Sequence, residues 1–240
     1  MSWHRNSRKY HKWLMLFVGM QFVIWSISGA YMVFFDIDYI HGDSLVVNQQ
    51  TALKSEQVNY PIAKIYTDHP NATNVELTNL LGAAVYRFSD GKEKYLLSAD
   101  TGKLLSPIIE DHAVLIAKHL YAQNDAKVRQ VSMIADHPPT ELSARHLPVW
   151  RVDFNDFASP SFYISAQTGE LVTKRHTFWR LFDWMFSFHV MDYVEEDASN
   201  KLLFIVTVLA LIASLFGLIL TYFRVFKKKG NKLNKARRAA

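Results

Sequence analysis

The sequence predicts an α+β membrane protein in which two transmembrane helices flank an extramembrane region made of two similar repeats. Two uncharged apolar runs, 13–35 and 202–223, support the helices, and basic residues collect at both chain ends. At about 1.5 Å of rise per residue, each run spans roughly 33 Å, which is close to the thickness of bilayer hydrocarbon. We therefore place the transmembrane helices at 13–35 and 201–224.

The first apolar run has a competing interpretation as a secretory signal peptide. The apolar part of a signal peptide is about 7–15 residues long, whereas this run is longer. The tripeptide Ser28-Gly29-Ala30 resembles a cleavage site, but the run continues past it to Phe35. The sequence therefore favours an uncleaved transmembrane helix.

Charge predicts the orientation in the membrane. The flanks 1–12 and 224–240 hold twelve of the 27 basic residues and no acidic residue, so the positive-inside rule places both termini in the cytoplasm. Residues 36–200 would then be periplasmic, in a bacterial inner membrane. The basic tail 225–240 is expected to lie near anionic lipid head groups, and nucleic acid binding is not needed to explain it. The chain has no cysteine, which excludes disulfides and thiolate-ligated iron–sulfur or haem sites within it.

The extramembrane region begins with a predicted linker, 36–54, and then repeats itself over 55–107 and 108–175. The segment YLLSADTG at 95–102 aligns with FYISAQTG at 162–169. Apolar spacing predicts a helix followed by antiparallel strands in each repeat. The predicted helices are 55–66 and 110–121, the first strands are 75–81 and 128–134, and the second strands are 85–88 and 149–154. A third strand and a short fourth meet at each turn, where Gly102 and Gly169 suit a positive φ. The two repeats are expected to share one core.

These paired units, which contain SADTGKLL and SAQTGELV, resemble PepSY domains. RKYHKWL, SISGAYMVF, FHVMDY and SLFGLILTYF, in this order along the chain, resemble the PepSY-associated transmembrane family, whose members are described as iron-regulated membrane proteins. Larger members have four or more spans, and some are similar to haem-b-binding reductases that pass electrons across the membrane. The resemblance therefore implies a link to iron uptake or electron transport. This sequence predicts only two spans, fewer than such a haem-binding bundle uses.

Three histidines are candidate haem b ligands. A predicted interfacial aromatic helix over 178–191, within a segment 176–200 that ends in an acidic loop, carries His189 on its apolar side. His41 lies just beyond the first span and is a candidate second ligand, and His11 lies at the inner edge of the first span. The alternative is that His189 bonds a backbone carbonyl or Asp192, and that His11 is a head-group anchor. No metal site other than haem is predicted.

The sequence offers no constellation typical of a catalytic site. Asp100-Thr101-Gly102 matches the catalytic triplet of aspartic proteases, but that chemistry needs two carboxylates, and Gln167 stands at the equivalent position of the second repeat.

Two functions remain open. The first is a non-catalytic binding or accessory subunit that contacts the lipid bilayer and either other membrane subunits or a second copy of itself. The second is a haem b electron-transfer protein that is complete only as an oligomer or with a partner subunit.

Overall fold

The structure is a computed structural model that describes residues 2–47, 52–123, 125–192 and 200–227. The chain divides into two compact units. We call 1–35 together with 182–240 the membrane unit, and 36–181 the lobe, and we describe each by itself. The predicted acidic loop and basic tail lie largely outside the described residues.

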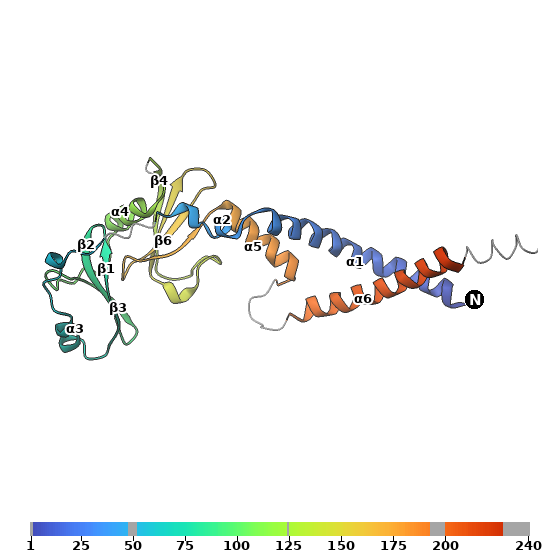
Figure 1. Cartoon of the computed structure of the whole chain (residues 1–240), viewed down its shortest axis with the longest axis horizontal. Coiled ribbons are helices and arrows are strands. Elements are labelled where there is room, and N and C mark those ends of the chain that lie inside the picture. The colour runs from blue at the N-terminus through green and yellow to red at the C-terminus, as the bar shows by residue number, and fades with distance from the viewer. Residues whose placement is uncertain (1, 48–51, 124, 193–199, 228–240) are drawn as a thin grey trace, which may run out of the picture. The chain divides into compact units, whose positions relative to one another are not determined.

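The membrane unit contains the two long apolar helices that the sequence predicts. They are α1 (Ser2–Phe34) and α6 (Lys201–Tyr222), and α6 continues into a π-helical turn at Phe223–Lys227 (Figure 1). Within them, Lys9–Phe34 and Lys201–Val225 are long and apolar enough to cross a membrane. The aromatic helix α5 (Thr177–Val190) begins in the lobe and ends in the membrane unit. The prediction of a two-span membrane protein with an α+β region between the spans is confirmed.

A strip of small side chains on α6 packs against α1. Val206, Ala210 and Ala213 are buried, as is Val18 of α1. Together with Gly217, these α6 residues recur at intervals of four, three and four, which places them on one helix face. Small residues let two helix backbones approach closely where no hydrophobic driving force acts between them, as in lipid.

The lobe consists of two repeats, and in each of them an α-helix precedes the antiparallel strands. The first repeat contains η2 (Ser55–Gln57), α3 (Ile62–Asp68), β1 (Ala72–Leu80), β2 (Ala83–Asp90) and β3 (Glu93–Ser98). The second contains α4 (Glu110–Leu120), β4 (Lys127–Ile134), η3 (Ala144–His146), β5 (Val149–Asn155), β6 (Ser161–Ser165) and β7 (Leu171–Arg175). Both sheets are antiparallel meanders, β1-β2-β3 and β4-β5-β6-β7.

The two repeats share a core, as the sequence predicts. Strand β2 alternates its buried side chains between two clusters. Val85 joins Ile116 of α4 and Phe154 of β5, whereas Tyr86 and its neighbours on the opposite face pack on Ile65 of α3. The first sheet is therefore covered by α3 on one face, and the side chains of its other face join α4 and the second sheet in one cluster.

Three parts of the lobe differ from the sequence prediction. The predicted helix 55–66 is wrong, because the α-helix begins only after Pro61, whose missing N–H suits a helix start but not its interior. The first repeat has a single β-bridge, Leu97 to Leu104, where a fourth strand was expected. The first half of the predicted linker forms α2 (Ile37–His41) and η1 (Asp43–Leu45), and Val46 pairs with Tyr121.

Both repeat turns use glycine as expected. Gly102 has φ +72° and Gly169 has φ +65°, a region that side chains with a Cβ rarely adopt. Gly169 also lies against Leu80 and Ile116, so the second turn fills a position between the first repeat and α4.

Candidate functional site

His189 is bound to α1 by its ring and by its backbone. Its Nδ1 lies 2.8 Å from Ser28 Oγ, and its carbonyl accepts a 2.7 Å hydrogen bond from the indole N–H of Trp25. Its Cε1 lies 3.6 Å from the point where a Cβ on Gly29 would stand. The last turn of α5 therefore packs on α1 at a point inside the candidate span.

The hydrogen bonds around Ser28 determine which nitrogen of His189 carries the proton. Ser28 Oγ lies 2.7 Å from the carbonyl oxygen of Ile24, which can only accept, so the single hydroxyl proton is donated there. Ser28 Oγ must then accept from Nδ1–H of His189. In the neutral imidazole, the lone pair of His189 is then on Nε2.

His11 also bonds a neighbouring helix through Nδ1, at a different point of the membrane unit. Its Nδ1 lies 3.0 Å from the carbonyl oxygen of Ala213 in α6 and must donate to it. A Cβ on Gly217 would stand 3.1 Å from its Cε1, so the ring packs over a position that only glycine leaves open. The lone pair of His11 is therefore also on Nε2.

His11 and His189 contact different points of the membrane unit. His11 and Ser28, which bonds the ring of His189, are separated by 17 positions on α1, which corresponds to roughly 26 Å. His41 is the exposed last residue of α2 in the lobe. Among the described residues, no group of three or more histidine or carboxylate side chains is placed to hold a metal ion.

A cavity of about 360 Å³ lies in the membrane unit beside a buried amide. Its lining is apolar apart from Gln21, and consists of Trp13, Leu16, Phe17, Met20, Ile24, Met191 and Val206. Within the described part of the chain, the Nε2 atom of Gln21 is buried and has no hydrogen-bond partner. Gln21 lies at the midpoint of the candidate span Lys9–Phe34, where water does not reach to satisfy it.

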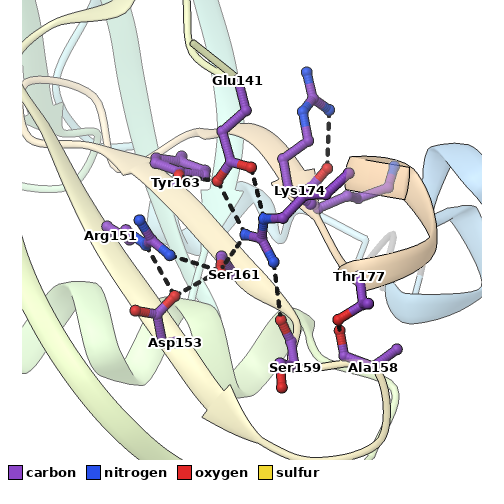
Figure 2. Close-up of polar contacts among 11 residues, drawn as sticks. Glu141, Arg151, Asp153, Ala158, Ser159, Ser161, Tyr163, Lys174 and Thr177 are labelled. Carbon is purple, nitrogen blue, oxygen red and sulfur yellow. Dashed lines mark hydrogen bonds and ion pairs between the residues drawn. The ribbon is translucent and has the colours of Figure 1, made fainter. Parts of the chain in front are cut away.

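The lobe fixes the start of α5 through a network of charged and polar side chains (Figure 2). Arg180 forms a fork with Glu141, with Nε to Oε2 at 2.7 Å and Nη2 to Oε1 at 2.9 Å. Tyr163 donates its hydroxyl to the same carboxylate. Arg180 also donates to Ser161 Oγ at 2.9 Å, and Ser161 donates to Asp153 at 2.5 Å. Every charge in the network has a partner, so it serves to hold α5 on the second sheet.

His176 lies directly before α5 and holds α2 through hydrogen bonds to its backbone. Its side chain is buried, and its Nε2 lies 3.0 Å from the carbonyl oxygens of both Tyr39 and Ile40. The sequence pattern does not identify His176, Glu141 or Ser28 as bonding partners. A polar residue in an otherwise apolar span, as at Ser28, was the available signal, but it does not identify the residue that will face it.

Acid is expected to destabilise the lobe in two steps. Burial lowers the pKa of His176 below 6.5, so the unfolded chain binds more protons and stability falls as the pH drops below about 6.5. Burial opposes ionisation of Glu141, but the hydrogen bonds from Arg180 and Tyr163 outweigh this effect and lower its pKa. The stability that ionised Glu141 contributes to the lobe is therefore lost as the pH falls below about 4.5. Melting temperatures measured from pH 8 to 3.5 test this. His176→Gln should flatten the first step and Glu141→Gln the second.

Gly217→Ala is expected to weaken the packing of α1 on α6 by about 1 kcal/mol, because the new methyl would press on the His11 ring and strain its bond to Ala213. Gly19→Ala is the matched control, since a Cβ there meets nothing within 4 Å. Thermal unfolding in mild detergent should show a lower midpoint only for the first variant. Equal midpoints for both variants would contradict the role given to His11.

Comparison with known proteins identifies the family. The family model described as the PepSY-associated TM region matches residues 8–240. The chain belongs to the PepSY-associated TM family. No curated protein and no solved structure matches the chain. Membership in a PepSY-associated TM family agrees with the two apolar helices, and the matched region contains both candidate spans and the whole lobe.

Proposed function

We propose that this PepSY membrane protein is a binding or accessory subunit of a larger membrane assembly linked to iron uptake or electron transport. The observation that carries the proposal is the buried amide of Gln21 beside an apolar cavity at the middle of α1. An amide without a partner in hydrocarbon is costly. A helix from another subunit, or from a second copy of this chain, would fill the cavity with its side chains and offer a polar group to the amide once Gln21 turns toward the cavity that it lines.

Site-specific photocrosslinking tests this proposal. The photoreactive residue p-benzoylphenylalanine at Phe17, which lines the cavity and is exposed, should yield an ultraviolet-dependent protein adduct in intact membranes. The same residue at Leu211, which is equally exposed on α6 but does not line this cavity, should not. The Gln21→Leu substitution should reduce the adduct at position 17. If both positions gave only lipid adducts, the proposal would be wrong.

The second candidate function is a haem b electron carrier, and the state of two histidines favours it. In His11 and His189, Nδ1–H is held by an acceptor, which leaves Nε2 free, as in metal-ligating histidines whose second nitrogen is bonded to an outer-shell group. These residues fit an axial ligand. Each would hold the iron of a haem through Nε2, and a second ligand would complete the site. The haem would supply one-electron transfer.

Absorption spectra separate the two candidates. Protein purified in mild detergent from haem-replete cells should, if it is a carrier, show a Soret band and an α band that appears on reduction with dithionite. His189→Ala should remove or shift these bands, whereas His112→Ala, at an exposed position of α4 in the lobe, should leave them unchanged. A colourless preparation obtained in normal yield would rule out this candidate and leave the first intact.

We also propose that the protein lies in the bacterial inner membrane with both termini in the cytoplasm. The basic flanks support this orientation through the positive-inside rule. A reporter active only in the periplasm should give signal when fused after Val47 and none when fused after Lys229. The opposite pattern would reverse the orientation without affecting the crosslinking or spectral experiments.

A further inference from the structure

The lobe exposes an apolar tip at the turn between β5 and β6. Phe157 at this turn is 75% exposed, and Ile37 at the start of α2 is 48% exposed. The rings of Phe157 and Tyr39 each contact Phe178 in the first turn of α5, at centroid distances of 5.9 and 5.5 Å. We call these three aromatic residues, Tyr39, Phe157 and Phe178, together with Ile37, which lies two residues before Tyr39 on α2, the tip patch.

The backbone of this turn is held firmly while its aromatic ring is left uncovered. The N–H and the hydroxyl of Thr177 both donate to the carbonyl of Ala158, at 2.8 and 2.9 Å. Asp156 accepts from the N–H of Phe157 and from the hydroxyl of Tyr121, both at 2.7 Å. Ala158 and Ser159 have φ values of +63° and +45°, a conformation that costs free energy in residues other than glycine. The fold thus maintains a strained turn that presents Phe157 outward.

Both connections between the lobe and the membrane unit leave from this patch. The apolar helix α1 ends at Phe34, and Ile37 follows three residues later, within about 11 Å of chain. The helix α5 starts at Thr177, beside the patch, and its residues from Phe182 onward belong to the membrane unit. Both covalent connections to the membrane unit therefore begin within a few residues of the tip patch.

We propose that the tip patch is a lipid-binding surface, and that Phe157 inserts into the interfacial layer of the bilayer on the lobe's side. Aromatic side chains favour this layer, and Arg175, whose guanidinium lies 3.9 Å from the ring centroid of Trp179, places a cation in the same segment of the chain. The lobe is then held to the bilayer by the patch as well as by its two covalent connections.

Spin labelling of the full chain in liposomes tests the proposal, and the natural absence of cysteine makes single labels unambiguous. A nitroxide on Phe157→Cys should collide more often with oxygen, which concentrates in lipid, than with the water-soluble relaxer NiEDDA. The control is Tyr66→Cys, since Tyr66 is also an exposed aromatic residue, at 48%, but lies on α3 of the first repeat. At this position the order of the two collision rates should reverse.

Two results would overturn the proposal. The first is a label at position 157 that is as accessible to NiEDDA as the label at position 66. The second is strong coupling between labels at position 157 of different molecules, which would assign the patch to a contact between copies. Because Phe157 is exposed, its replacement should not disturb folding, and an unchanged melting temperature of the labelled variant would verify this.

Discussion

Arg180→Met is expected to lower the free energy of unfolding of the lobe by about 3 kcal/mol, because it leaves a buried carboxylate without its cation. The side chain of Glu141 is only 9% exposed, and after the substitution it would retain only the hydroxyl of Tyr163. For a chain of this size, such a loss corresponds to a fall of roughly 9 °C in the melting temperature. Thermal unfolding of the full chain in detergent, followed by near-ultraviolet circular dichroism, measures it.

Two further variants show whether the loss comes from a charge left without its partner. The double variant Glu141→Leu/Arg180→Met should recover much of the stability, since no buried charge remains without a partner. Lys174→Met is the matched control for loss of an ion pair. Its partner Asp43 is 55% exposed, so water replaces the lysine and little change is expected. If the double variant were as unstable as Arg180→Met, the network would contribute through packing instead.

The sequence is sufficient to predict those helices and strands that depend on a local pattern of residues. The two apolar helices follow from uninterrupted apolar length, and the second repeat follows from alternation in β5 and helical spacing in α4. The helix expected over 55–66 is wrong because its apolar spacing runs across Pro61, and a proline disfavours helical backbone at the residue before it. This restriction is visible in the sequence.

The contacts of the candidate site were not predictable in the same way. Helical spacing places His189 on an apolar face, but its partner Ser28 is 161 positions away in the sequence. Likewise, Arg180 bonds Glu141, which lies 39 positions away in a loop of the second repeat. Local periodicity indicates which face of a helix is polar. It carries no information on which distant segment will cover that face.

Gly102→Ala is expected to destabilise the first repeat by about 3 kcal/mol, more than its backbone conformation alone explains. A Cβ at this position would stand 2.2 Å from Cε2 of Tyr60 and 2.4 Å from its Cδ2, so the ring lies directly against the turn. The ring cannot easily move away, because the N–H of Tyr60 donates to Ala99 at 2.8 Å and its hydroxyl donates to Asp68 at 2.9 Å. Loss of the repeat should appear as a lower melting temperature in the same thermal experiment.

Gly82→Ala separates the two causes of this loss, because Gly82 also has a positive φ, +88°, but a Cβ there meets nothing within 4 Å. It should cost only the conformational part, about 1 kcal/mol. Removing the ring should in turn relieve the overlap, so Tyr60→Ala/Gly102→Ala is expected to be less unstable than the sum of its two single variants. If Gly102→Ala and Gly82→Ala cost the same, the aspartate-threonine-glycine turn would need its glycine for φ alone, and the contact with Tyr60 would be incidental.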